Sequence, residues 1–507
     1  MAHGYIPWNP RQVSLLPCDP SSWLSDNHIA PILLDVVETF DLSAFRRQST
    51  DGRGVFGFDP TMMVVLVLYC LLQKRCSARS MEHYIQCDLG GRYLCGNGSV
   101  PGWRCIADFR QKYRNQLATL FAQSVECCIE AKLVDTSDVF GDGSKLQAFA
   151  SKQSNISYGK ADKVLNILQK KFDALLEEAD RLDADESKIE KANLLRKKAE
   201  KYQDTKQRIL DAKQRMEERA RLQKEDWDNT PKDKRPHTKA PDGSPGDDDR
   251  SNTVDPESRL MKFKDGSFKQ AYNAQVVAEG RNQIILGATL SNDCTDVNQL
   301  QVTVEHVIET IDGKPKTWVA DGGYLSEENI KYLDSRKIDA IICPNRRPDK
   351  EEVNKQHPSS GDANLLDGDV KNTNASSCEE YTKRGLKRQR AKPTQPKKPS
   401  WAQEQMKAKL ATEEGKKIYS LRCQVIEPVF GQMKGSPGNP GMLSRFTVKG
   451  LSNCRDVLLL QCTAHNIGKL LRSKIAECIT RQKPSLPTYM NRLPILKLRG
   501  QTLAMAI

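Results

Sequence analysis

Apolar runs and apolar residues spaced every three to four positions predict a compact helical N-terminal domain over 1–133. The run 58–85 predicts a buried helix, a polar turn and a second helix. The same spacing continues through Ile106, Phe109, Tyr113, Leu117 and Phe121. Arginines lie among these positions: Arg79, Arg92, Arg104, Arg110 and Arg114. They would suit a DNA-binding bundle, although charged outer faces are typical of any helix.

A heptad seam begins after Lys160, where apolar residues alternate in steps of three and four. It predicts either two long helices folded into an antiparallel hairpin or one helix of a dimeric coiled coil. We assign 159–252 to this coiled-coil insertion, with a linker rich in Pro, Gly and charge over 226–252. A second segment of similar composition, 346–411, is expected to be a flexible basic insertion, and 476–507 a C-terminal tail.

The remaining segments alternate strand and helix patterns. A short strand over 137–141 ends at Asp142, and two strands follow the insertion, at 267–278 and 282–289. A helix over 297–310 precedes a strand over 316–320 that ends at Asp321. A helix over 326–335, a strand over 339–343 and a helix near Glu427 complete the series. This order is that of an α/β, ribonuclease H-like mixed sheet, with the catalytic domain at 134–158, 253–345 and 412–475.

Composition narrows the class of partner. Lys and Arg total 78 against 65 Asp and Glu, a net charge of +13, which favours a polyanion such as DNA over a basic protein without a nucleic-acid role. The 15 cysteines contain no CxxC spacing, so neither a zinc nor a disulfide framework is expected. The longest apolar run, 62–72, is too short to cross a bilayer, and no secretory signal is visible. We therefore expect a cytoplasmic, nucleoid-associated protein without membrane contact.

Three acids stand where metal-dependent phosphoryl transfer would need them. Asp142 and Asp321 each follow strand-like apolar residues and precede glycine, and Glu427 lies on the last helix of the series. Two Mg²⁺ ions roughly 3.5–4 Å apart activate the attacking oxygen and stabilise the leaving oxygen, and they prefer carboxylate ligands. Singly, an Asp before Gly is more often a turn residue. Their common placement in the strand and helix order favours a metal site.

Pro428 directly follows Glu427 and disfavours helical geometry at the glutamate. The helix is therefore expected either to begin at Pro428, with Glu427 as its N-cap, or to kink there. Within a helix, Gly431 and Lys434 would share the face of Glu427.

Several motifs together resemble the DDE transposases of bacterial insertion sequences, in the group with a helical N-terminal domain and a coiled insertion after the first aspartate. The motifs are DGSKLQAFAS from Asp142, YNAQ at 272–275, ADGGY around Asp321, IEPVFGQMK around Glu427 and TAHNIGKLL around His465. The sequence departs from this family at FDP, 58–60, where a His-Pro pair is usual. It also lacks a paired-cysteine cluster between Asp321 and Glu427.

The resemblance implies a catalytic triad of Asp142, Asp321 and Glu427 that binds two Mg²⁺ ions, for which Mn²⁺ can substitute. It implies that Tyr419, Arg422 and Lys434 contact transposon-end phosphates, although Tyr419 can equally be a packed aromatic residue. Tyr272, Asn273 and Gln275 are expected to support the sheet and the site from behind the ligands. His465 and Asn466 are expected to be structural, where the last helix meets the sheet.

The function implied is a DNA transposase: water hydrolyses a phosphodiester at each transposon end, and the freed 3′-OH attacks target DNA. The partners are double-stranded DNA, as transposon ends and target, and a second copy of the chain, since two ends need two active sites. The heptad seam is expected to assist this homodimer. Two alternatives stay open: a ribonuclease H-like nuclease that cuts without joining, and a DNA-binding descendant without catalysis.

Overall fold

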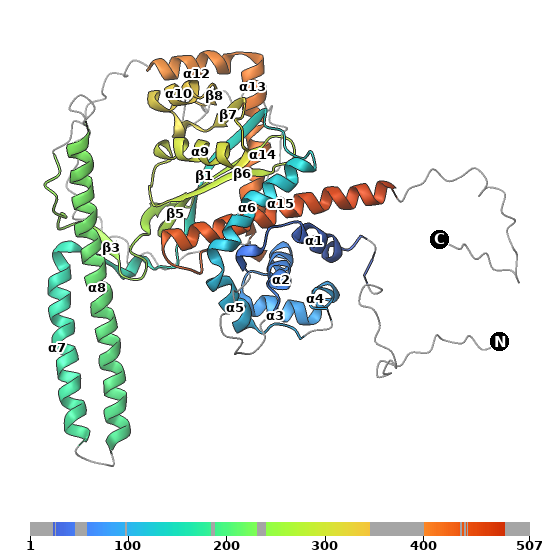
Figure 1. Cartoon of the computed structure of the whole chain (residues 1–507). Helices are drawn as coiled ribbons and strands as arrows, with labels where there is room; N and C mark the ends of the chain where they lie inside the picture. The colour runs from blue at the N-terminus through green and yellow to red at the C-terminus, as the bar shows by residue number, and fades with distance from the viewer. Residues whose placement is uncertain are drawn as a thin grey trace, which may run out of the picture.

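The computed structural model describes residues 24–25, 27–45, 58–96, 99–183, 188–230, 240–344, 400–436, 439–440, 443 and 445–481. One continuous hydrophobic core joins the N-terminal helices, the central sheet and the C-terminal helix. The long pair of helices α7 and α8 stands apart from this body (Figure 1).

The N-terminal region is helical, as predicted. Its helices are α1 (Ile29–Glu38), α2 (Pro60–Leu72), α3 (Ala78–Cys87), α4 (Leu89–Leu94), α5 (Trp103–Lys112) and α6 (Arg114–Glu130). Helix α2 is buried nearly throughout because the other helices surround its almost entirely apolar sequence. It begins sharply, since Asp59 accepts from the backbone of Thr61 and Pro60 occupies the first helical turn.

A six-stranded mixed sheet forms the centre of the molecule. Its strands are β1 (Asp138–Gln147), β4 (Arg259–Lys262), β5 (Phe268–Glu279), β6 (Ile285–Ser291), β7 (Thr317–Ala320) and β8 (Asp339–Ile342). β5 pairs antiparallel with β1 along one edge, while β4 and β6 share its other edge. β1, β7 and β8 run parallel. This topology confirms the ribonuclease H-like fold.

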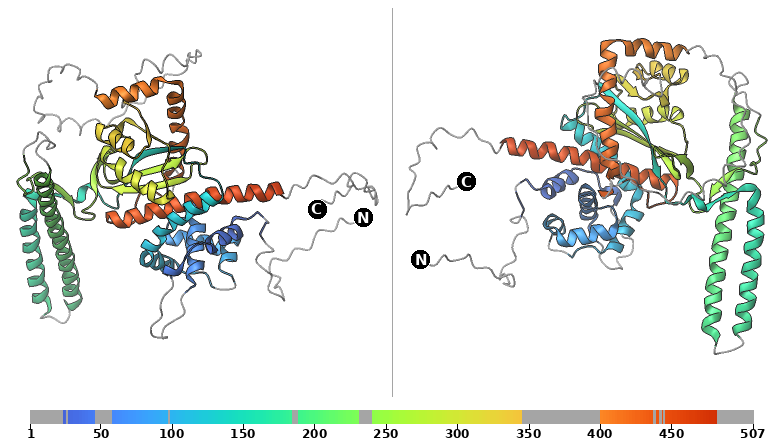
Figure 2. Two further views of the ribbon diagram at one scale, coloured as in Figure 1. Left: turned by 45° about the horizontal axis from the view of Figure 1, so that its top comes forward. Right: turned by 180° about the vertical axis from the view of Figure 1, so that it is seen from behind.

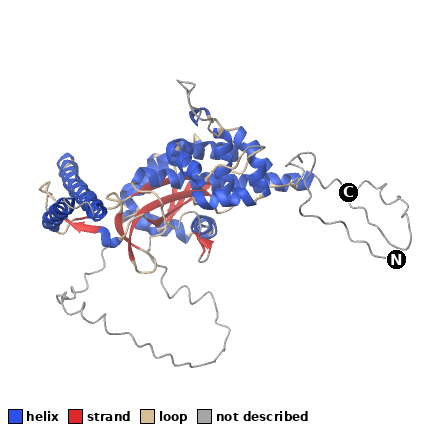
Figure 3. Ribbon diagram, turned by 90° about the horizontal axis from the view of Figure 1, so that it is seen from below, coloured by secondary structure: helices blue, strands red, loops and turns tan. Residues whose placement is uncertain are grey.

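Helices cover both faces of the sheet (Figure 3). They are α9 (Leu300–Ile311), α10 (Glu327–Ser335), α12 (Trp401–Ala411), α13 (Glu413–Ser420), α14 (Arg422–Lys434) and α15 (Leu451–Arg481). Asn466 of α15 bonds both the backbone N–H and the carbonyl of Ile285, each at 2.9 Å, so it satisfies the edge strand β6. His465 bonds the carbonyl of Gln283 at 2.9 Å. The structural role expected of both residues is confirmed.

The coiled insertion is an antiparallel hairpin of α7 (Tyr158–Asp183) and α8 (Ile189–Asn229), which projects clear of the body in each view (Figure 2). Seam residues such as Leu165 and Ala179 pack against α8 of the same chain. The hairpin therefore uses the seam that we expected to assist a dimer. Strands β2 (Asn155–Ser157) and β3 (Arg250–Asn252) pair where the insertion leaves and rejoins the body.

Several boundaries differ from the sequence prediction. β1 does not end at Asp142 but continues to Gln147, because its pairing with β5 extends beyond its pairing with β7. The short strand β4 was not predicted.

The expected linker 226–252 is shortened by α8 and β3, and α12 lies inside the segment 346–411 that was expected to be flexible. α15 reaches into the expected tail, while 345–399 and 482–507 lie outside the described residues. The two-residue strands β9 (Gly435–Ser436) and β10 (Asn439–Pro440) pair after α14.

Candidate active site

The two predicted aspartates lie side by side because their strands are neighbours. β1 and β7 run parallel, and their last paired residues are Phe140 and Val319. Asp142 and Asp321 each come two residues later, Asp142 within β1 and Asp321 just past the end of β7, so they occupy equivalent positions on two segments whose strands lie about 4.8 Å apart. The Asp321 side chain caps the turn that follows β7, accepting from the backbone of Gly323 at 2.8 Å. The register thus explains why two acids 179 positions apart share one edge of the sheet.

Helix α14 brings the third acid to the same edge. It begins at Arg422 rather than at Pro428, so Glu427 lies within the helix and is not its N-cap. Pro428 cannot donate to the carbonyl of Gln424 one turn earlier. The side-chain amide of Gln283 donates to that carbonyl at 2.9 Å instead. This tertiary bond lets the helix continue through the proline.

Arg422 connects the acids. One Nη atom lies 3.0 Å from an Asp142 carboxylate oxygen and the other lies 4.0 Å from Glu427. The side chains of Asp142 and Arg422 are 17% and 11% exposed, whereas that of Glu427 is 56% exposed. Burial alone would lower the pKa of Arg422, but Asp142 and Asp321 raise it overall. The guanidinium therefore offsets part of the charge of the aspartates.

The charge of Asp142 is only partly balanced. Burial raises the pKa of this carboxyl above its usual range, Arg422 opposes the rise and the neighbouring Asp321 adds to it. Within the described part of the chain, no three His, Cys, Asp or Glu side chains converge closely enough to hold a metal ion. The donor set nevertheless fits a hard divalent cation: carboxylate oxygens from two fixed strands and one exposed helix position, around a place where Arg422 already supplies positive charge.

Two lysines extend the positive charge around Asp142. Lys434, at the end of α14, donates to the hydroxyl of Ser144, which lies two residues after Asp142 on the same face of β1. Burial lowers the pKa of Lys434, and Lys264 of the β4–β5 turn lowers it further. The same Lys264 acts on Asp142, so it is close to both groups. Gly431 has open space where a side chain would stand, one turn after Glu427.

Tyr419 lies on α13, just before Arg422. It is half-buried, and burial together with the neighbouring Cys343 raises the pKa of its hydroxyl. Tyr419 thus lies near Arg422 and Asp321, whereas Lys434 lies at the other end of α14, beside Ser144.

The comparison with protein families agrees with this geometry. A family model described as the transposase DDE domain matches residues 233–438. The chain carries a DDE-type transposase domain. The matched segment contains Asp321 and Glu427, while Asp142 and the N-terminal helices precede it. No curated protein and no solved structure matches the chain significantly.

Membership of this family makes the protein an enzyme of DNA transposition, in a class that acts on DNA and uses divalent metal ions. Among the helices that the structure describes, none combines the length and apolar character needed to cross a membrane.

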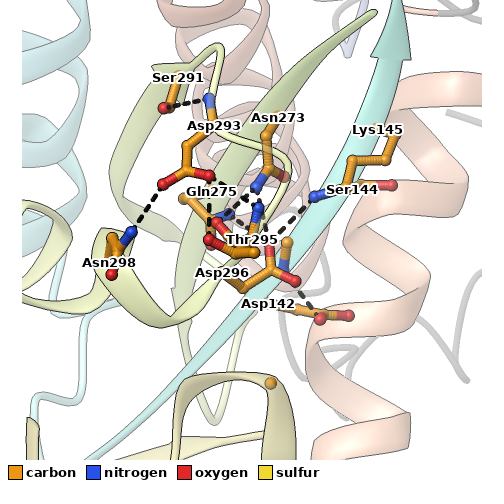
Figure 4. A network of polar contacts seen from close by, with 12 residues as sticks. Asp142, Ser144, Lys145, Asn273, Gln275, Ser291, Asp293, Thr295, Asp296 and Asn298 are labelled. Atoms are coloured by element: carbon orange, nitrogen blue, oxygen red, sulfur yellow. Dashed lines mark hydrogen bonds and ion pairs between the residues drawn. The ribbon is translucent and has the colours of Figure 1, made fainter. Parts of the chain in front are cut away.

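The YNAQ motif of the transposase divides between the two faces of the sheet. The Tyr272 hydroxyl donates to Asp255 at 2.8 Å, and its ring packs edge-on against Phe446. Asn273 and Gln275 point to the opposite face from Asp142 and both donate to Asp296, at 2.7 and 3.0 Å (Figure 4). Tyr272 therefore supports the sheet further along the strand from the acids. The amides of Asn273 and Gln275 lie on the opposite face of the sheet from Asp142.

Sequence reasoning missed three residues near the transposase acids: Ser144, Lys264 and Asp296. Ser144 follows from the alternation of β1 once the strand is known to continue past Asp142. Lys264 lies in the basic hairpin KFKDGS, which reads as an ordinary turn. Asp296 lies in the loop SNDCTD, which precedes a helix and resembles a capping segment. The partners of Lys264 and Asp296 come from distant parts of the chain, so no local pattern indicates them.

Proposed function

We propose that the protein cuts DNA at transposon ends and joins each freed 3′-OH to target DNA, with Asp142, Asp321 and Glu427 as the catalytic acids. The observation that carries this proposal is the common position of the three acids around Arg422, at the edge where β1, β7 and α14 meet. The strands fix two of the acids. The exposed Glu427 is free to adjust when a ligand arrives.

We propose Mg²⁺ as the ion, with Mn²⁺ as a substitute, because every ligand in the set is a carboxylate. When bound, two such ions would activate the attacking oxygen and stabilise the leaving oxygen. In the protein without metal, Arg422 supplies the positive charge that the ions would supply when bound. It is placed to release the acids and turn to a phosphate when DNA enters, since a guanidinium binds either anion with two donors.

The chain's own cations would hold the DNA backbone. Lys434 contacts Ser144, which lies two strand residues, roughly 7 Å, from Asp142 along β1. With Arg422 and Lys264 it surrounds the acids with positive charge that phosphates can neutralise. The Tyr419 hydroxyl, which bonds Cys343 in the absence of DNA, would donate to a phosphate oxygen instead.

We propose that the N-terminal helical region, 1–133, is a DNA-binding domain. A groove of about 560 Å³ lies between it and α15. Four basic residues from three distant segments line the groove: Lys74, Arg110, Arg114 and Arg445. A backbone phosphate in this groove would neutralise charge that the protein gathers there.

We further propose a homodimer, because two transposon ends need two active sites, and action on the nucleoid in the cytoplasm. The catalytic domain would comprise 134–158, 253–345 and 412–475, with the α7–α8 hairpin as an insertion. The dimer contacts would lie outside the hairpin seam, which is buried within one chain.

The test is electrophoresis of a labelled transposon end incubated with the full chain, Mg²⁺ and a target plasmid. The proposal expects cleaved ends and then products joined to the plasmid. Cleaved ends that never become joined would show a nuclease without strand transfer. Binding without cleavage, unchanged by Asp142→Ala, would show a DNA-binding protein without catalysis.

A further inference from the structure

A fourth carboxylate, Asp296, lies directly behind the proposed site, in the loop between β6 and α9 (Figure 4). One of its oxygens receives the amides of Asn273 and Gln275 and the ammonium of Lys145, the last at 3.3 Å. The three donors come from strands β1 and β5. A single loop oxygen thus ties together the two strands that pair beside Asp142.

The register places these contacts on the face of the sheet opposite the three acids. Gly143 pairs with Gln275, and Lys145 pairs with Asn273. Because side chains alternate along a strand, all four face away from Asp142 and toward Asp296. Asp296 therefore touches the strand from behind, one residue after the first acid.

A glycine allows this close approach on the segment that follows Asp142, and Asp296 also contacts the turn that follows Asp321. A Cβ on Gly143 would lie 2.6 Å from one Asp296 oxygen. A Cβ on Gly323 would lie 3.5 Å from the other oxygen and 2.9 Å from a carboxylate oxygen of Asp321. Asp296 thus fills the space beside the residue that follows Asp142 and the turn that Asp321 caps. The close approach of Asp296 to Gly143 gives the Asp142–Gly143 sequence a steric reason beyond turn formation.

Further hydrogen bonds join the same loop to the turn after β7. The buried Tyr324 donates its hydroxyl to Gln275, which itself donates to Asp296. The Asn329 amide lies 2.8 Å from the carbonyls of both Val297 and Tyr324. The loop, β5 and the Asp321 turn therefore form one hydrogen-bonded unit.

We propose that Asp296 is a positioning residue that sets the separation of Asp142 and Asp321, and with it the affinity of the site for its divalent ion. A charged acceptor suits this place, because the oxygen serves two amides and an ammonium at once, and charge-assisted bonds are the stronger ones. This inference rests on the proposed function, since it assumes that the two aspartates bind metal.

The decisive measurement is Mn²⁺ binding to the full chain without DNA, followed by electron paramagnetic resonance. Asp296→Asn keeps the shape of the side chain and removes its charge. We expect Mn²⁺ affinity to fall by about 10- to 100-fold, as is usual when a residue that orients metal ligands is lost. The Mn²⁺ concentration for half-maximal cleavage should rise by the same factor, while metal-free DNA binding stays unchanged.

Asp293→Asn is the matched control. Asp293 belongs to the same loop, but its side chain accepts from Thr295 and Asn298 nearby, at about 3 Å. It should leave Mn²⁺ affinity as in the wild type, even if the loop loosens. Equal losses in Asp293→Asn and Asp296→Asn would overturn the proposal, because loop integrity alone would then explain the effect. Wild-type affinity in Asp296→Asn would overturn it as well.

Asn273→Ala covers the case in which Asp296→Asn fails to fold. It removes one of the three donors and keeps the carboxylate, so a smaller loss of Mn²⁺ affinity, below about tenfold, is expected. No loss in a folded Asn273→Ala protein would contradict the proposal.

Asp142→Asn separates this inference from the proposed function. If Asp142→Asn keeps Mn²⁺ affinity, the metal site itself is wrong; if it loses affinity while Asp296→Asn does not, only the positioning role is wrong.

Discussion

The carboxylates on the two faces of strand β1 differ in how far neighbouring groups balance their charge. On the face toward α14, Asp142 meets a single guanidinium, and Glu427 is largely exposed. On the opposite face, Asp296 is held by three donors and packed against glycine backbones. The first face leaves its acids short of positive charge. On the second face, groups of the protein itself supply the hydrogen bonds that Asp296 accepts.

This difference follows from what each face is proposed to do. Metal ions and DNA must enter and leave the α14 face, so permanent internal partners there would compete with them. The geometry of the ligands must nevertheless be fixed before they arrive, because preorganised charge is more effective than charge that has to rearrange. A rigid network behind the strand supplies that geometry without occupying the site.

The largest expected effect comes from removing an acid on the α14 face. Asp142→Asn keeps the size of the side chain but should lower the cleavage rate by roughly 10²–10³-fold or more, since the charge that binds metal is lost. Single-turnover cleavage of a labelled end measures this. Asp138→Asn, at the start of the same strand, should cleave within about twofold of the wild type. Undiminished cleavage by Asp142→Asn would remove the distinction between the faces.

A smaller effect is expected at the cations of the same face. Lys434→Ala should reduce the slope of log affinity for DNA against log salt concentration by about one, because one phosphate contact disappears. Fluorescence anisotropy over a series of salt concentrations measures the slope. Lys331→Ala removes an exposed lysine from α10 and should leave the slope unchanged. An unchanged slope in Lys434→Ala would mean that this lysine serves only Ser144.

The raised pKa of Asp142 predicts how pH and metal affect stability. A carboxyl whose pKa is raised by folding binds its proton more tightly in the folded state. The metal-free protein should therefore lose stability as the pH rises from about 3.9, the usual unfolded value, through the folded pKa. Mg²⁺ should restore it at neutral pH, by about 2.7 kcal/mol at one hundred times its Kd.

Thermal melts at pH 5 and pH 7.5, with and without Mg²⁺, measure this effect. The gain in Tm from Mg²⁺ should be larger at pH 7.5, because protons compete for Asp142 at the lower pH. In Asp142→Asn the metal-dependent gain should disappear at both values. An equal gain at both pH values in the wild type would indicate that Asp142 is not the group that links protons to metal.

The sequence predicts the α14 face better than the opposite one. The strand order brings Asp142 and Asp321 to one edge, and the motif around Glu427 supplies the helix. For that helix the sequence left open a start at Pro428 or a kink there, and it could not decide between them because the bond from Gln283 to the Gln424 carbonyl is tertiary. Asp296 was missed for the same reason, since its donors lie 21 to 151 positions away. Periodicity reports which face a residue occupies, but not which distant side chain meets it.

The smallest expected effect tests whether the α14 face is built to adjust. Pro428→Ala restores a backbone donor to the Gln424 carbonyl and should stabilise the protein by roughly 1 kcal/mol, a fraction of the usual penalty for proline within a helix, because Gln283 already offsets part of it. Gln283→Ala should then destabilise the Pro428→Ala protein less than it destabilises the wild type. Urea unfolding of the four proteins measures this coupling as a double-mutant cycle. Zero coupling would mean that Gln283 does not compensate for the proline. A stiffer helix should also slow cleavage, by less than about tenfold, because Glu427 would adjust less readily to its ligand.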